Sequence, residues 1–334
     1  FTTLEKRHYY CQEELRHNRR FAPQIYLDVL PVYELQGRYV LGADNLHENA
    51  QQGEIVDYVI KMNQFDQDCL LSHRLKLAQI DTHHIEKLGI QVARFHRSIN
   101  ENKPVDSQIL EPIEENFTVL KALLTEASEQ EFLEVLHDRM LQMYHKVADA
   151  LADRKQQGFI RECHGDLHLE NIALIDDQVV LFDGIEFNDA FRWIDTMSDC
   201  AFLIMDLEDH GYPVFASHFL NCYLSETGDY QGLAVLPLYK LYRATVRAKV
   251  AALNMQTLDE HSKAGQQNSL SLKGYLKLAE QYTHSHEAVL IITHGISGSG
   301  KSWLSSQIAD HINGILLRSD VERKRLFAES GEFL

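Results

Sequence analysis

The glycine-rich segment 295–302 carries the clearest chemistry in this sequence. It reads GISGSGKS and fits the pattern G-x-x-x-x-G-K-[ST], after an apolar stretch at 288–292 and before a helical stretch at 303–312. Glycines in such a turn let backbone N–H groups surround a polyphosphate at a helix N-terminus. We therefore predict a P-loop (Walker A motif) for ATP and Mg²⁺; the alternative is a glycine turn that only links strand and helix. The predicted binding residues are Gly295, Gly298, Gly300, Lys301 and Ser302.

An aspartate and an arginine that could take part in the chemistry follow this helix. The apolar residues 315–317 are the next strand candidate, and Asp320 and Arg323 come just beyond them. In a parallel α/β sheet, residues beyond the carboxyl end of a strand face the ligand crevice. The D-x-x-R step resembles P-loop kinases of small molecules and polynucleotide ends. The resemblance implies that Asp320 is a catalytic base and that Arg323 contacts phosphate or substrate; the alternative is an exposed helix start with Asp320 as its N-cap.

A second group of oxygen-bearing side chains surrounds two short apolar segments, 172–175 and 179–182. Two aspartates separate the segments and favour a tight turn, so we expect a β-hairpin. Asp166 and Asn171 precede the first strand, and Asp183 follows the second. A loop before one strand of a hairpin lies beside the loop after its partner. The sequence therefore predicts that these three side chains come together.

The stretch H-G-D-x-x-x-x-N at 164–171, followed by a hydrophobic-hydrophobic-Asp step at 181–183, resembles the aminoglycoside phosphotransferase and choline kinase group. These enzymes are relatives of protein kinases. The resemblance implies that Asp166 accepts the proton of a substrate hydroxyl or orients that hydroxyl. It also implies that Asn171 and Asp183 hold Mg²⁺ on the phosphates of ATP.

Further positions enter through the same resemblance. His164 is expected to support the backbone of its loop, and Glu186 is a candidate for a second metal ion, with an exposed carboxylate after a strand as the alternative. The charged segment 5–20 resembles the N-lobe helix whose glutamate pairs with a phosphate-binding lysine on the preceding strand. Glu14, or Glu13, would be that glutamate. The strand with the lysine is absent from the sequence, so we expect impaired ATP affinity.

The predicted fold is α+β and protein-kinase-like, with a partial N-lobe sheet and a helical C-lobe, followed by a truncated α/β P-loop NTPase domain. Val-, Ile- and Tyr-rich segments at 25–35, 38–41 and 54–62 indicate a small antiparallel sheet, and the apolar face of 131–154 indicates a long helix. The polar run 254–268 is the best loop or linker candidate. The predicted domains are the partial N-lobe (1–62), the helical C-lobe with the catalytic hairpin (63–253), a linker and helix (254–287) and the partial P-loop domain (288–334). We expect the chain to be a fragment of a longer protein, cut at both ends.

Composition limits the partners. Lys and Arg total 32 against 49 Asp and Glu, a formal charge of -17, which disfavours binding to nucleic acid or to an anionic membrane surface. The five cysteines form no CxxC pair and favour reduced thiols and a cytoplasmic location. No apolar run approaches the ~18 residues of a membrane helix. The sequence does not indicate an oligomeric state.

These features predict ATP-dependent phosphoryl transfer to a hydroxyl of a small molecule. In one alternative, the kinase-like part is a catalytically idle binding module and the P-loop part is the active ATPase or small-molecule kinase. In another, the acceptor is a protein hydroxyl. The HGD step and the lack of an APE-like anchor after Asp183 argue against a protein kinase.

Overall fold

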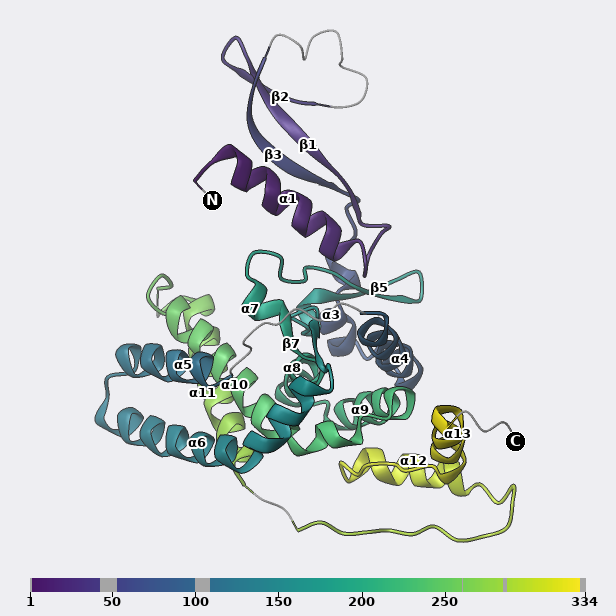
Figure 1. Cartoon of the computed structure of the whole chain (residues 1–334). Coiled ribbons are helices and arrows are strands. Elements are labelled where there is room, and N and C mark those ends of the chain that lie inside the picture. The colour runs from purple at the N-terminus through teal and green to yellow at the C-terminus, as the bar shows by residue number, and fades with distance from the viewer. Residues whose placement is uncertain (1, 43–52, 100–108, 260, 285–286, 331–334) are drawn as a thin grey trace. The chain divides into compact units, whose positions relative to one another are not determined.

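The computed structural model describes residues 2–42, 53–99, 109–259, 261–284 and 287–330 (Figure 1). They fall into two compact units. The first unit comprises Phe1–Ile80 and Glu162–Trp193, and the second comprises Asp81–Arg161 and Ile194–Leu334. The hairpin with the predicted catalytic residues therefore belongs to the same unit as the N-terminal sheet. The predicted domain boundaries at residues 62, 253 and 287 stay predictions.

A helix and a three-stranded sheet open the first unit. Helix α1 spans Leu4–Asn18, and the side chain of Thr3 caps its first turn. Strands β1 (Tyr26–Leu35), β2 (Arg38–Leu41) and β3 (Glu54–Met62) form an antiparallel sheet in the order β2-β1-β3. The helix lies along β1 and β3 (Figure 1). These elements confirm the predicted small sheet and the predicted N-terminal helix.

The predicted hairpin is also present in the first unit. Strands β5 (Ile172–Ile175) and β6 (Gln178–Leu181) pair antiparallel, with Ile172 opposite Leu181. The turn residues Asp176 and Asp177 have φ angles of 49° and 60°, as a type I′ turn requires. Aspartate tolerates this left-handed conformation better than most residues, so the Asp-Asp step explains why the chain turns here.

Short elements complete this unit and its junctions with the second unit. Strands β4 and β7 form a further two-stranded sheet. The short elements are η1 (Gln67–Cys69), α3 (Leu71–Lys76), β4 (Ile160–Glu162), η2 (Leu169–Asn171), α7 (Asp189–Arg192) and β7 (Trp193–Asp195).

One apolar core joins the hairpin to the N-terminal elements. Leu15 of α1, Tyr26 of β1 and Val180 of β6 are buried in the same cluster, and Phe182 packs against it from the end of the hairpin. Phe182 also meets Phe65 edge to face, with ring centroids 5.1 Å apart. The end of α1 and the start of β1 are thus fixed beside the loop that follows β6.

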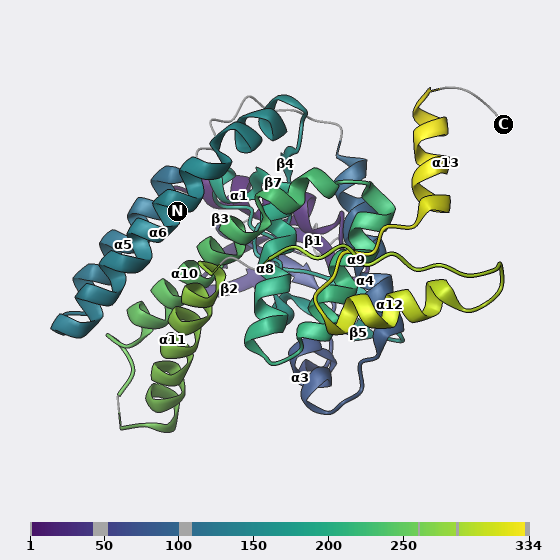
Figure 2. The same ribbon diagram turned by 90° about the horizontal axis from the view of Figure 1, so that it is seen from below.

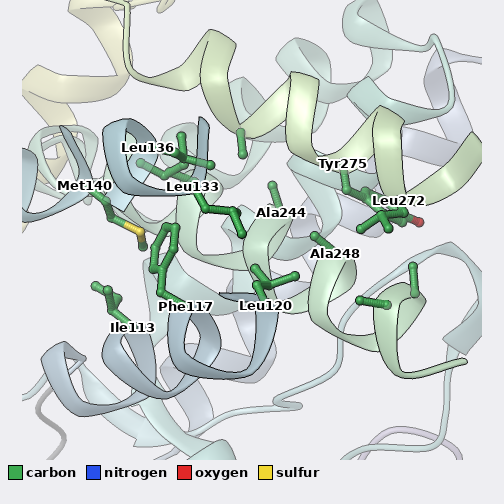
Figure 3. Packing of buried hydrophobic residues seen from close by; sticks show 14 of the residues in the cluster. Ile113, Phe117, Leu120, Leu133, Leu136, Met140, Ala244, Ala248, Leu272 and Tyr275 are labelled. Atoms are coloured by element: carbon green, nitrogen blue, oxygen red, sulfur yellow. The ribbon is translucent and has the colours of Figure 1, made fainter. Parts of the chain in front are cut away.

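The described part of the second unit is mainly helical. Its first seven α-helices and a 3₁₀ turn are α4 (Thr82–Ser98), α5 (Leu110–Leu123), α6 (Ala127–Gln156), α8 (Thr196–Asp209), α9 (Pro213–Thr227), η3 (Tyr230–Ala234), α10 (Leu236–Asn254) and α11 (Lys263–Tyr282). Buried side chains repeat at helical spacing, such as Ile113, Phe117 and Leu120 on α5. Figure 3 shows them gathered with side chains of α6, α10 and α11. The predicted helical C-lobe is confirmed, and α6 contains the long helix expected at 131–154.

Helix α11 corrects the C-terminal part of the predicted loop or linker at 254–268, whereas the described residues 255–259 and 261–262 lie outside any helix, as predicted. The helix begins at Lys263, where the Ser262 hydroxyl accepts a hydrogen bond from the Gly265 N–H at 3.0 Å. It then packs along α10 (Figure 2) and buries Leu272 and Tyr275 in the helical core. The run looked like a linker because its first turns are polar, and its apolar face only appears further along the chain.

The C-terminal segment forms two helices, α12 (Lys301–His311) and α13 (Ser319–Ser330). The strands predicted at 288–292 and 315–317 are wrong, since the structure has no strand at either position. A strand needs a neighbour for its backbone N–H and C=O groups, and the described residues provide none beside 288–292. The apolar side chains of residues 289–292 are largely exposed, and the exposed fractions of Val289 and Leu290 are each 81%.

A side chain of helix α9 binds backbone groups at the start of the second predicted strand, residues 315–317. Asn221 donates to the Gly314 carbonyl at 3.0 Å and accepts from the Leu316 N–H at 2.8 Å. One turn earlier on α9, His218 binds Asp310 of α12 at 2.7 Å. Side chains thus hold backbone groups that a sheet would otherwise pair.

Among the described residues, no helix combines the length and apolar character that a membrane span requires.

Candidate functional site

Asp166 and Asn171 are in direct contact in the first unit. The Asn171 side-chain amide donates to the Asp166 carboxylate (Oδ2) and to the Asp166 carbonyl, both at 3.0 Å. Because both bonds use Nδ2, the Asn171 Oδ1 faces away from Asp166 and is available to a cation. The Asp166 side chain is about one third exposed, at 35%, and His168 Nε2 lies 3.2 Å from its Oδ2. A hydroxyl from solution can therefore approach this carboxylate.

The hairpin places the neighbour of Asp183 against Asn171. The Phe182 N–H donates to the Asn171 carbonyl at 3.0 Å, directly beyond the pairing of Ile172 with Leu181. Asp183 is the next residue, and its side chain is exposed. The predicted meeting of Asp166, Asn171 and Asp183 thus has a structural basis in the strand register. Their functional roles stay predictions.

His164 lies beneath these loops and is fully buried. Its Nε2 donates to the Phe182 carbonyl at 2.9 Å, and its own carbonyl accepts from the Ile185 N–H at 2.9 Å. The histidine therefore links the loop of Asp166 to the loop of Asp183. This contact agrees with the supporting role that was expected for His164.

Carboxylates gather around Asp183. Burial, and then the charges of Glu186 and Asp183, raise the pKa of Glu14 to about 7. Burial also raises the pKa of Glu186, and the charge of Asp183 adds to that rise. In the described part of the chain, no ion pair joins Glu14 to a basic side chain. Mg²⁺ prefers oxygen ligands such as carboxylates and amide oxygens, and a cation would also offset the repulsion between neighbouring carboxylates. The chemistry of these residues therefore fits such an ion.

The raised pKa of Glu14 predicts a pH-dependent stability. Its folded-state pKa of about 7 lies above the ordinary value of 4.5, so the folded state binds more protons than the unfolded state between these values. Stability must then fall as pH rises from about 4.5 to 7, by roughly 1 kcal/mol once screening by solvent is considered. Glu14→Gln should remove this loss.

Urea unfolding at pH 5 and pH 8 in EDTA measures the effect of Glu14→Gln. Glu34→Gln on the exposed side of β1 is the matched control and should keep the wild-type difference between the two pH values. If Glu14→Gln keeps the wild-type difference in the free energy of unfolding between pH 5 and pH 8, the raised pKa of Glu14 does not contribute to the pH dependence of stability.

The P-loop residues lie at the start of α12 in the second unit. Gly298 and Gly300 have φ angles of 77° and 81°, which other residues rarely adopt, and a Cβ at either would meet no atom within 4 Å. Lys301 Nζ donates to the Ile296 carbonyl and to the Ser299 hydroxyl, and Ser302 is exposed in the first helical turn. Gly295 opens the turn. Open glycine backbone before a helix N-terminus fits a polyphosphate.

Asp320 and Arg323 lie in the first turns of α13, and both are exposed. Asp320 pairs with Arg318 at 3.1 Å. Among the described residues, no hydrogen bond or ion pair joins either side chain to the P-loop. The catalytic roles that the D-x-x-R resemblance implies for them remain predictions.

Two residues near Asp183 were missed by the sequence analysis. The Tyr26 hydroxyl accepts from the Asp183 N–H at 3.1 Å. Asn18 binds both backbone groups of Gly184, accepting from its N–H at 2.7 Å and donating to its carbonyl at 3.3 Å. Neither residue belongs to a recognisable motif. An asparagine at the last position of a helix is typical of a simple helix end, so the sequence offered no distinct signal.

Comparison with sequences of known proteins gives two results. Residues 290–332 match the family model of an AAA domain. Proteins of Mycobacterium tuberculosis and Mycobacterium bovis, both described as uncharacterized, are each 25% identical to the chain over 331 residues. The matches cover 98% of this chain but 62% of each relative. The chain therefore spans less than two thirds of the length of these relatives.

Solved structures with a similar course of the chain include small-molecule kinases. A choline kinase of Cryptosporidium parvum is 13% identical, with a TM-score of 0.47, and covers 68% of this chain and 72% of its own. An amicoumacin kinase is 14% identical, with a TM-score of 0.48, over 81% and 78%. A choline kinase of Streptococcus pneumoniae is 15% identical, with a TM-score of 0.43, over 77% and 95%.

The elements themselves, a small antiparallel sheet beside α1, a hairpin flanked by polar loops and a mostly helical second unit, are those predicted for the kinase-like part. The AAA match covers the predicted P-loop part. The chain therefore combines the elements expected of a kinase-like part with a C-terminal segment that matches an AAA domain.

Proposed function

We propose that this chain belongs to an ATP-dependent phosphotransferase that acts on a hydroxyl of a small molecule, with an appended P-loop module that binds a nucleotide. One observation carries the proposal. Asn171 binds Asp166 through its amide nitrogen and binds Phe182, the neighbour of Asp183, through its carbonyl. The proposed proton acceptor Asp166 and the two proposed cation ligands, Asn171 and Asp183, thereby lie on adjacent loops.

The proposed chemistry depends mainly on positioning. Asp166 accepts the proton of the acceptor hydroxyl or orients that hydroxyl, and Asn171 fixes the rotamer of Asp166 by holding its Oδ2. Asn171 and Asp183 would hold Mg²⁺, and Glu186 and Glu14 would be further candidates to hold it. When bound, Mg²⁺ offsets the negative charge of the phosphates of ATP. Phosphoryl transfer has a loose transition state, so Asp166 does not need a raised pKa.

The P-loop segment supports the alternative function, in which it performs the chemistry and the kinase-like unit only binds. Gly298 and Gly300 leave the backbone before α12 open, and Lys301 and Ser302 follow at the helix N-terminus. In this alternative, Asp320 is the base and Arg323 contacts phosphate or substrate. We favour the first function because the contact between Asp166 and Asn171 joins a proton acceptor to a cation ligand. Nothing comparable joins Asp320 to the P-loop in the described residues.

The proposal also concerns the class of acceptor, the cellular location and the complete protein. The charge of -17 suits a small-molecule acceptor better than nucleic acid or an anionic membrane. The five cysteines without a CxxC pair support a cytoplasmic location. Because the chain spans 62% of its relatives, we propose that the complete protein contains further parts of both nucleotide sites.

A screen of the complete protein tests the proposed function. ADP formation is followed with a panel of hydroxyl-bearing metabolites and antibiotics, in the wild type and in Lys301→Ala. We expect a compound that stimulates ADP formation and becomes phosphorylated, with most of this transfer retained in Lys301→Ala. Loss of acceptor-dependent transfer in Lys301→Ala would instead assign the chemistry to the P-loop.

A further inference from the structure

The loop after β6 is held by side chains from outside the hairpin. Each N–H group of residues 182–185 has a hydrogen-bond acceptor. The carbonyls of Asn171 and His164 accept from the first and last of these groups, and both residues belong to the loop of Asp166. The two groups between them are bound by Tyr26 and Asn18, which come from the start of β1 and the end of α1.

The contacts of these two side chains are buried and specific. Asn18 is 0% exposed and Tyr26 is 1% exposed. Asn18 uses both ends of its amide on one residue, accepting from the Gly184 N–H at 2.7 Å and donating to the Gly184 carbonyl at 3.3 Å. The Tyr26 hydroxyl accepts from the Asp183 N–H at 3.1 Å. The backbone groups around the Asp183 side chain are therefore fixed on both sides.

The backbone at this point needs such support. Asp183 has a φ of 62°, in the left-handed region, which aspartate tolerates better than most residues but less readily than glycine. Next to it, a Cβ on Gly184 would lie 2.8 Å from Nε2 of His17 on α1. The loop is thus pressed against α1 while Asp183 keeps an unfavourable conformation. Strained residues persist only where the surroundings hold them.

We infer that Asn18 and Tyr26 are positioning residues that hold the Asp183 carboxylate in place for a divalent cation. This inference rests on the proposed function, in which Asp183 is a metal ligand. Neither side chain touches the cation or the substrate. Through Asn18, helix α1 contributes indirectly to the metal affinity of the loop, in addition to supplying Glu14.

A role in fold stability alone makes a different prediction. Loss of packing would lower the unfolding temperature but would leave cation binding to the folded protein unchanged. Partners that orient a metal ligand typically contribute about 10- to 100-fold to metal affinity. Cation affinity in the absence of turnover therefore separates the two roles.

The test uses Asn18→Leu and Tyr26→Phe, which nearly preserve volume and remove the hydrogen bonds to the loop. All variants carry Lys301→Ala, so that nucleotide at the P-loop does not contribute. Binding of Mn²⁺ in the presence of a non-hydrolysable ATP analogue is followed by electron paramagnetic resonance. Asn116→Leu is the matched control, because Asn116 is equally buried at 1% but lies on α5 of the second unit.

We expect both variants to weaken Mn²⁺ binding by about 10-fold or more, and Asn116→Leu to leave it unchanged. Wild-type affinity in folded Asn18→Leu and Tyr26→Phe, together with lost binding in Asp183→Ala, would overturn this inference and leave the proposed function standing. Unchanged Mn²⁺ binding in Asp183→Ala would contradict the proposed function itself. If Asn18→Leu does not fold, Tyr26→Phe alone decides.

Discussion

Replacement of Asp183 by alanine is expected to weaken binding of Mg²⁺·ATP to the kinase-like unit by more than about 100-fold, since partners that only orient a ligand already contribute 10- to 100-fold. Asp183 is the exposed carboxylate that follows β6, and the raised pKa of Glu14, of about 7, reflects in part its negative charge. Without Asp183, the cation loses a charged ligand, and Glu14 and Glu186 lose one of the negative charges near them.

Calorimetry of a non-hydrolysable ATP analogue, with and without Mg²⁺, measures this effect in a Lys301→Ala background. Asp183→Ala should lose the gain in affinity that Mg²⁺ provides. Asp28→Ala is the control, because Asp28 is an exposed aspartate of β1 whose side chain accepts a hydrogen bond from the neighbouring Val29 N–H. A gain from Mg²⁺ that survives in Asp183→Ala would remove this residue from the metal site.

The substitution Asp166→Asn is expected to slow phosphoryl transfer by about 10²- to 10⁴-fold, the usual contribution of a proton-accepting side chain. The amide has the same shape, and its oxygen can still accept the hydrogen bond from Asn171 Nδ2. It cannot accept the proton of the acceptor hydroxyl. Binding of Mg²⁺·ATP should therefore change little, and the loss should lie in the transfer step.

Single-turnover transfer from ATP to the acceptor by the complete protein measures the effect of Asp166→Asn. Asp320→Asn is the matched control, since Asp320 is an exposed aspartate of α13 that could serve as a base only in the P-loop segment. The proposed function predicts that Asp320→Asn keeps the transfer. The reverse result, with transfer lost in Asp320→Asn and kept in Asp166→Asn, would favour the alternative function.

The kinase-like elements were predictable because local sequence patterns decide them. The Asp176-Asp177 step forms the tight turn between β5 and β6, and the apolar residues on either side pair in register. Hairpin geometry then brings Asn171 and Phe182 together, as the positions of the two strands in the sequence indicated. The meeting of all three side chains, Asp166, Asn171 and Asp183, stays a prediction. These signals need no information about distant parts of the chain.

The elements that could not be predicted depend on distant partners. Apolar residues at 288–292 have the composition of a strand, but a strand forms only where another one pairs with it. Leu316 binds Asn221 of α9, which lies far away in the sequence. The contacts of Asn18 and Tyr26 with the Asp183 loop are of the same kind, because they join segments more than 150 residues apart.

The central claim is that Asn171 and Asp183 hold the cation that accompanies ATP beside Asp166. A crystal structure of the complete protein with Mn²⁺ and a non-hydrolysable ATP analogue tests it most directly, because Mn²⁺ is identified by its anomalous scattering. The account predicts an anomalous peak coordinated by Asn171 Oδ1 and the Asp183 carboxylate. A peak only beside Ser302 of the P-loop, with analogue bound there alone, would contradict it.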